Sequence, residues 1–367
     1  MISRIHTKTS KVFLLLTSAL AVFLLATLGI QVFKLYPNLE LNEPIYGTYT
    51  SDEKQFLKTY YLMKSGNNFY EAFKIASEGR VAGTPLDNDS FKWRLPTVFY
   101  LWKALAVNGR QIFLLYLIWL AAFFIGIFFL LKKLEGIFVS LWAIILLTPY
   151  FLNLSDYKTS FLFVEWWALF PFIIGLAFFV YGKYKISWIF FLIAIITREH
   201  MIIPLLSFVA IAFLKKEYRL FFSSLVVAFL CFYGFHYIFI ANQFQNYNLS
   251  SLVQFNSRFH LIHKNILMKM FAFSMQQYPL ISLRVNLWLI LASFVSLIGF
   301  LKSNNKPTAE YYLYTAPWSL LIAFMFIAGD YNDYWGILFM PLLIITVPFL
   351  FKRLYDIRRD ILGFLHF

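Results

Sequence analysis

The sequence predicts an all-α protein: a polytopic membrane helix bundle of about ten spans, two of them short, with amphipathic helices on the outer face. Of the 367 residues, 60% are hydrophobic and 14% are charged, whereas soluble domains average about 45–50% apolar and about 25% charged residues. Apolar runs of around 20 residues recur along the chain, and each can cross a hydrocarbon core about 30 Å thick as a helix. They lack the alternation of barrel strands, so we expect helices.

The first predicted span is a retained signal-anchor helix, because the run is too long for a cleaved signal and no small-residue cleavage site accompanies it. The expected spans are 12–33, 111–131, 136–152, 161–181, 186–197, 201–214, 219–241, 283–301, 311–329 and 334–351. We therefore expect one membrane domain over residues 1–367, with both termini in the cytoplasm.

Lys and Arg gather in alternate gaps between these spans, for example at Lys132–Lys133 and Lys215–Lys216. The net charge of +14 would suggest nucleic acid in a soluble protein. Here it matches the tendency of basic residues to remain on the cytoplasmic side of a membrane. We therefore expect no nucleic-acid partner. Cys231 is the only cysteine, which excludes an intrachain disulfide and a multi-cysteine metal site.

The segment 186–214 is interrupted by charge. Basic gaps at both of its ends require an even number of crossings, and Arg198, Glu199 and His200 divide its apolar run, with Pro204 following. Two short helices that meet at an outer turn satisfy both observations. Charged side chains at that depth must face protein or line a cavity.

Two predicted outer segments are too long to be simple connections. The first outer loop covers 34–110, and within it 52–64 and 69–76 carry aromatic side chains on one face, as do helices that lie at a membrane surface. The second outer loop covers 242–282. We expect the chemistry of the protein on this outer face.

The acidic pair Asp52 and Glu53 opens the first surface helix. Acidic residues in a first turn often serve only the helix dipole. In the functional interpretation, one carboxylate is a general base that takes a proton from an acceptor hydroxyl. The sequence does not distinguish the two carboxylates.

Basic residues supply candidate anion ligands at two further places. Arg94 lies where the first loop returns to the bilayer, as either an interfacial anchor or a phosphate clamp. Arg198 and His200 are predicted to bind an anion, with Glu199 orienting one of them, unless Arg198 and Glu199 form a purely structural ion pair.

The second outer loop carries Arg258 and His260, which either meet a phosphate as supporting residues or lie on a solvated face. His260 and His263 have no evident third ligand, so they do not indicate a metal site, and the sequence leaves the use of a divalent metal open. The acidic residues at 330–333 are of the kind that commonly form turns, and we interpret them as a short outer turn. The sequence contains no nucleotide-binding glycine loop and no long cytoplasmic gap, so we expect no cofactor.

Three short motifs carry a resemblance to a known family. Asp52–Glu53 precedes Tyr60–Tyr61 and Gly66, Arg94-Leu95-Pro96 closes the first loop, and the run from Ile195 to His200 precedes Pro204. With the long first outer loop, this layout resembles the GT-C superfamily of integral membrane glycosyltransferases. More specifically, it resembles bacterial members that act in cell-surface polysaccharide assembly.

The resemblance implies a hexosyltransferase reaction at the outer face of the cytoplasmic (inner) membrane. The implied partners are a polyprenyl-phosphate sugar donor, a glycan or lipid acceptor, and membrane lipids. Asp52 would be the base, or Glu53 in its place. Arg94, Arg198 and His200 would stabilise charge on the departing phosphate.

Three other functions remain open at this point. A polysaccharide polymerase or ligase would take a lipid-linked oligosaccharide and depend on Arg258 and Arg284 rather than on Asp52. A lipid-linked glycan transporter or flippase would be expected to show related halves, and this chain has one broken helix pair without a counterpart. The third is a structural membrane subunit.

Overall fold

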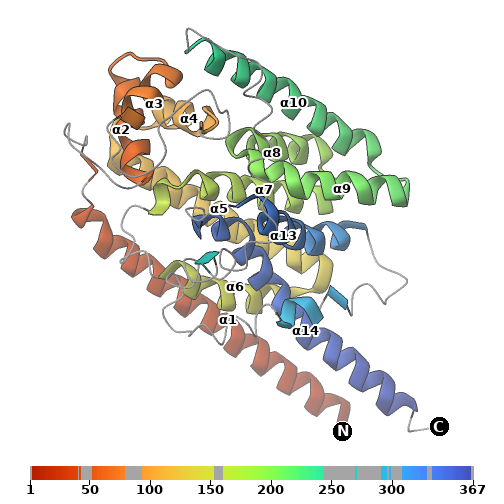
Figure 1. Cartoon of the computed structure of the whole chain (residues 1–367). Helices are drawn as coiled ribbons and strands as arrows, with labels where there is room; N and C mark the ends of the chain where they lie inside the picture. Colours follow the sequence, from red (N-terminus) through yellow and green to blue (C-terminus); the bar gives the residue numbers. More distant parts are fainter. Residues whose placement is uncertain are drawn as a thin grey trace.

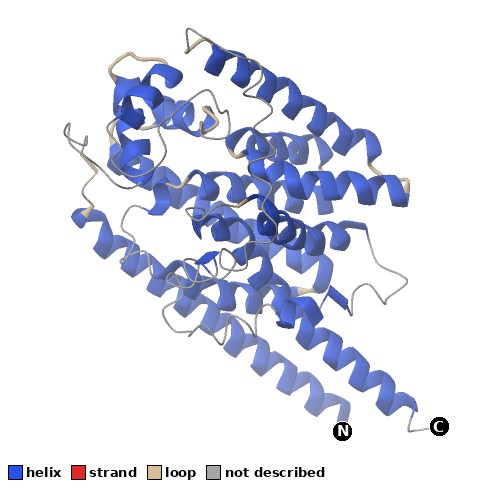
Figure 2. Ribbon diagram, viewed as in Figure 1, coloured by secondary structure: helices blue, strands red, loops and turns tan. Residues whose placement is uncertain are grey.

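The computed structural model describes the ranges 2–39, 41–42, 52–78, 93–152, 160–243, 269–270, 291–295, 297–298, 308–328 and 333–364. Within these ranges every regular element is a helix (Figure 2), which confirms the predicted all-α class. The second outer loop and the span predicted at 283–301 lie almost entirely outside them.

The helices of the bundle follow the predicted spans closely. Three of the described helices are long and apolar enough to cross a membrane: α1 (Ile2–Leu35), α5 (Gly109–Glu135) and α10 (Arg219–Ala241). The other helices of the bundle are α6 (Ile137–Leu152), α7 (Val164–Val180), α8 (Tyr184–Thr197), α9 (Ile202–Lys215), α13 (Thr308–Ile327) and α14 (Gly336–Phe364).

Apolar side chains on the outside of the bundle indicate a membrane protein. Helix α1 exposes Leu15 and Phe33, and α10 exposes Leu220 and Leu230. A hydrocarbon environment suits such surfaces, whereas soluble monomers rarely expose contiguous apolar patches this extensive.

Helix α7 is the centre of the bundle and is buried along nearly all of its length. It packs against α5 and α8, while α6 lies between α1 and α14, and α9 between α10 and α13. The first turn of α7 is therefore enclosed by protein on every side. A charged group there must find its partners within the protein.

Three short helices form a cap at one end of the bundle, and both termini lie at the opposite end (Figure 1). The cap consists of α2 (Asp52–Lys64), α3 (Phe69–Glu78) and α4 (Thr97–Leu105). Its core is aromatic: Phe69 packs on Phe99 with ring centroids 5.1 Å apart. The helices predicted at 52–64 and 69–76 are confirmed with small changes of boundary.

Helix α2 is more enclosed than its predicted surface position required, because Lys58 is buried along with the aromatic face. The reason is that α3, α4 and the 3-10 helix Ser160–Leu162 all pack against α2. The Tyr60 hydroxyl donates a hydrogen bond to the Ala106 carbonyl oxygen at 2.9 Å. Burial, with a smaller contribution from Tyr61, raises the pKa of Tyr60 to about 12, so this donor keeps its proton.

A close backbone contact joins the first residues after α1 to the start of α5. A Cβ atom built on Gly109 would lie 2.5 Å from the Leu41 carbonyl oxygen, so only glycine fits here. We expect Gly109→Ala to destabilise the protein by about 1–3 kcal/mol, measured as a lower thermal unfolding midpoint in detergent. Gly234→Ala is the matched control, because a Cβ at that helical position meets nothing within 4 Å. Equal stability of the two variants would contradict this prediction.

Candidate functional site

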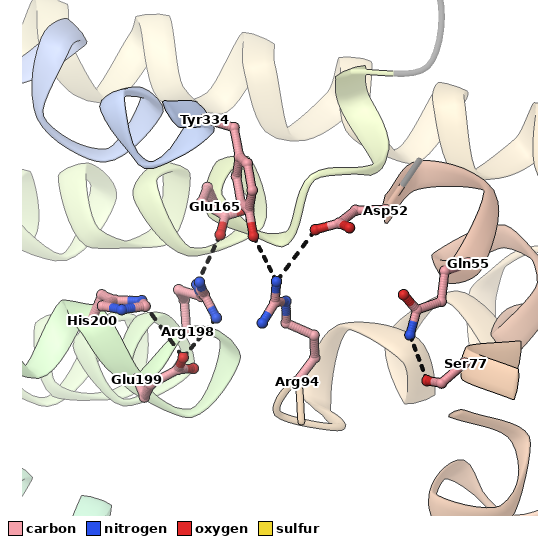
Figure 3. A network of polar contacts seen from close by, with 9 residues as sticks. All are labelled: Asp52, Gln55, Ser77, Arg94, Glu165, Arg198, Glu199, His200 and Tyr334. Carbon is pink, nitrogen blue, oxygen red and sulfur yellow. Dashed lines mark hydrogen bonds and ion pairs between the residues drawn. The ribbon is translucent and has the colours of Figure 1, made fainter. Parts of the chain in front are cut away.

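Charged and polar side chains from five segments meet under the cap (Figure 3). Asp52 is the first residue of α2, Arg94 precedes α4, and Glu165 lies in the first turn of α7. The break between α8 and α9 and the 3-10 helix before α14 complete the group. We call this set the polar network: Asp52, Arg94, Glu165, Arg198, Glu199, His200 and Tyr334.

The break between α8 and α9 has the predicted form of two short helices joined at a charged turn. Helix α8 ends at Thr197, Arg198 is extended with φ −143° and ψ 116°, and a 3-10 helix covers Glu199–Met201. Pro204 lies in the first turn of α9, where the absent N–H costs no intrahelical hydrogen bond. The charged residues interrupt the helix because their partners lie beside it.

Arg198 is completely buried and forms ion pairs with two carboxylates. Its Nε lies 2.8 Å from Glu165 Oε1, and its Nη1 donates a hydrogen bond to Glu199 Oε1 at 2.6 Å. The guanidinium also lies over the Trp335 ring, 5.6 Å from the ring centroid. A buried cation requires such pairing. The ion pair that offered a structural explanation of this motif is therefore present, and Glu165 extends it.

Arg94 is held more loosely, on the side of the network that faces α2. Its Nη2 donates a hydrogen bond to the Tyr334 hydroxyl at 2.6 Å and lies 3.4 Å from Asp52 Oδ2. Burial lowers the pKa of Arg94, but Tyr334 and Asp52 outweigh it and hold the pKa above its ordinary value. Arg94 thus remains a cation.

A backbone contact fixes the Arg94 segment against the broken helix pair. The Thr97 hydroxyl, in the first turn of α4, donates a hydrogen bond to the Ile196 carbonyl oxygen near the end of α8. This contact places the loop that carries Arg94 beside the turn that carries Arg198.

His200 occupies the far side of the network. Its Nδ1 lies 3.5 Å from Glu199 Oε1, and its ring centroid lies 4.0 Å from that of Trp335. Glu199 thus lies near both basic residues of the turn and accepts a hydrogen bond from Arg198 alone of the two, so the orienting role predicted for it stays a prediction.

The structure thus brings together five residues chosen from the sequence, namely Asp52, Arg94, Arg198, Glu199 and His200. Between the two candidate bases, Asp52 is the one with an ion pair to Arg94, while Glu53 is half-buried beside it. The supporting residues Arg258 and His260 lie outside the described ranges. Among the described residues, no group of three His, Cys, Asp or Glu side chains could hold a metal ion.

Two members of the network, Glu165 and Tyr334, are absent from the sequence-based selection. Glu165 carried a usable signal, because a carboxylate inside a predicted span is costly unless it is paired. Tyr334 carried none, since it is one of 23 tyrosines in the chain. Its partner Arg94 lies 240 positions earlier.

The charges are unevenly distributed across the network. Two carboxylates contact Arg198 at 2.6 and 2.8 Å, whereas one carboxylate lies 3.4 Å from Arg94. The remaining contact of Arg94 described above is with a neutral hydroxyl. Because Coulomb energy falls with distance, the carboxylate near Arg94 offsets its charge less than the two carboxylates near Arg198 offset that of Arg198. Arg94 can therefore attract a further anion more strongly than Arg198 can.

The fold and the site together define a class: an all-helical membrane protein with a buried polar network under a helical cap. No protein-family model matches the chain, and a search of characterised proteins found no match. The function is therefore argued from the network itself.

Proposed function

We propose that the protein is a membrane glycosyltransferase. In this proposal it moves a sugar from a polyprenyl-phosphate donor to a glycan or lipid acceptor at the outer face of the cytoplasmic membrane. One observation carries the proposal: a carboxylate suited to act as base, Asp52, lies 3.4 Å from a guanidinium suited to bind phosphate, Arg94. Glycosyl transfer from a phosphate leaving group needs both groups at one reacting centre.

The proposed reaction forms one C–O bond and breaks another. The acceptor hydroxyl attacks the anomeric carbon, its proton passes to Asp52, and the bond from that carbon to the phosphate oxygen breaks. Arg94 binds the departing phosphate, because guanidinium presents a planar set of donors that matches phosphate oxygens. Arg198 and His200, in the adjoining turn, contribute to the electrostatic environment of the leaving group.

The position of the basic helix ends supports the proposed sidedness. Helix α5 begins next to the cap and is 27 residues long, so its last turn lies about 40 Å away. That turn carries Lys132 and Lys133. Basic residues favour the cytoplasmic side, which supports an outer position for the cap and Asp52. The proposed topology has about ten spans and both termini in the cytoplasm.

The assay that tests this function uses the purified full chain in lipid nanodiscs. It would be supplied with polyprenyl-phosphate sugars labelled in the sugar and with crude surface glycan or lipid as acceptor. We expect labelled acceptor and free polyprenyl phosphate in equal amounts. Consumption of lipid-linked oligosaccharide alone would instead indicate a polymerase or ligase. Movement of labelled lipid between leaflets without bond cleavage would indicate a flippase.

A further inference from the structure

Arg94 and Arg198 differ in how accessible they are to a ligand. The Arg198 side chain is completely buried between two carboxylates, whereas 12% of the Arg94 side chain and 10% of the Asp52 side chain are exposed. Both guanidiniums have a buried nitrogen without a hydrogen-bond acceptor in the part of the chain that the structure describes, so their exposure is what distinguishes them. Of the two guanidiniums, Arg94 is therefore the one that can take up an additional anion.

An anion that binds Arg94 meets a competitor, because the same Nη2 atom faces both Asp52 and Tyr334. The Asp52 contact is the longer of the two, at 3.4 Å. A phosphate oxygen at ordinary charge-assisted distance, about 2.8 Å, would outcompete a carboxylate at that separation. The resting contact thus occupies one oxygen of the carboxylate that has to accept the proton.

We propose that Arg94 passes from Asp52 to the phosphate of the donor, so that donor binding releases the carboxylate to act as the base. This inference rests on the proposed function. It adds an order to the reaction: the phosphate must be bound before the acceptor hydroxyl loses its proton.

Tyr334 is the positioning residue in this exchange. Its hydroxyl holds Arg94 at 2.6 Å and carries no charge, so it keeps the guanidinium in place without competing as an anion. The Tyr334 ring stacks on Phe163, with centroids 4.9 Å apart and planes 9° apart. Phe163 is the N-cap of α7, the helix that also carries Glu165. The centre of the bundle therefore holds Tyr334 against Arg94 while the phosphate replaces Asp52 as the other partner of Arg94.

Competition for one cation has a measurable consequence. If Asp52 and the phosphate compete for Arg94, each weakens the binding of the other by the same factor. Removal of the Asp52 charge must then tighten phosphate binding, even though it removes the base. A carboxylate that contacted the substrate favourably would have the opposite effect.

The test measures binding of polyprenyl monophosphate to the full chain in nanodiscs. We expect Asp52→Asn to tighten binding about 5- to 20-fold, within the usual range of coupling between sites. Asp52→Ser removes the same charge and is the second variant to measure if the Asp52→Asn protein does not fold. Arg94→Ala should weaken binding at least about tenfold, and Tyr334→Phe about threefold. The Tyr334→Phe variant keeps the ring stack and loses one hydrogen bond, so its unfolding temperature should fall less than that of Arg198→Ala.

Control variants and probes separate the effect of the Asp52 charge from general surface charge and from binding of the lipid chain. Glu71→Gln removes one carboxylate from an exposed position in the cap and should leave the affinity unchanged. An uncharged polyprenol probe should bind wild type and Asp52→Asn equally. Inorganic phosphate in solution shows whether the phosphate alone is recognised or whether its lipid is required, and Asp52→Asn should strengthen either interaction.

Each outcome bears on a different claim. If Arg94→Ala weakens binding but both Asp52 variants bind no tighter than wild type, the exchange is wrong and the proposed function stands. If polyprenyl monophosphate binds no differently to Arg94→Ala, the phosphate site and the proposed function fail together. Tighter binding by Glu71→Gln equal to that of Asp52→Asn would reduce the effect to general surface charge and overturn the exchange.

Discussion

Asp52→Asn is expected to abolish sugar transfer while the amount of protein in the membrane stays unchanged. The amide keeps the size and shape of the carboxylate but cannot accept the proton of the acceptor hydroxyl. Loss of a general base costs about 100- to 10,000-fold in rate. Asp52 starts α2 at the edge of the network and 10% of its side chain is exposed, so the substitution should be tolerated structurally. The measurement is transfer of labelled sugar in nanodiscs, with immunoblots for abundance.

Glu53→Gln identifies which carboxylate acts. Glu53 is the next residue of α2 and is half-buried, whereas Asp52 contacts Arg94. Inactivation by Glu53→Gln together with full activity of Asp52→Asn would exchange their roles. Normal activity of both variants would remove the acidic pair from the mechanism and favour a polymerase or ligase.

Arg198→Ala is expected to be the most destabilising single change in the polar network. It would leave the carboxylates of Glu165 and Glu199 buried without their cation. Removing one partner of a buried ion pair costs about 3–5 kcal/mol. The measurement is the thermal unfolding midpoint of the protein in detergent. The same variant should bind donor more weakly than Lys133→Ala, an exposed cation at the far end of α5.

A double substitution distinguishes charge from lost packing. Arg198→Ala leaves the Glu165 carboxylate buried without its cation, and Glu165→Gln removes that charge. The double variant should therefore recover part of the stability that Arg198→Ala loses. If Arg198→Ala is as stable as wild type, the ion pairs contribute little to folding. If it then also binds donor normally, Arg198 has no part in the site either.

The sequence predicted the helices well because their signal is local. An apolar run of sufficient length forms a helix wherever it inserts, and the observed boundaries of α6, α8 and α9 lie within two residues of those expected. The interruption at Arg198 was predictable for the same reason, since adjacent charges in an apolar run are visible without knowing their partners.

The partners themselves could not be predicted, because pairing depends on tertiary packing. Arg198 was expected to bind an anion unless it paired with Glu199, and in the structure it contacts both Glu199 and Glu165 of α7, a partner that the sequence-based selection did not include. The sequence indicated an aromatic face on 52–64, whereas the elements that enclose α2 also bury Lys58. Tyr334 shows the limit most clearly, because nothing near it in the sequence indicates that its hydroxyl meets Arg94.

The long separation between Arg94 and Tyr334 also bears on how the protein is made. A ribosome adds about 5–20 residues per second, so the 240 positions between these partners take about 12–48 s to synthesise. During that interval the segment with Arg94 is present without Tyr334, one of the two partners of its Nη2 atom. A nascent chain halted before Tyr334 already contains the residues of the ion pairs around Arg94 and Arg198, but it lacks the hydroxyl that holds Arg94.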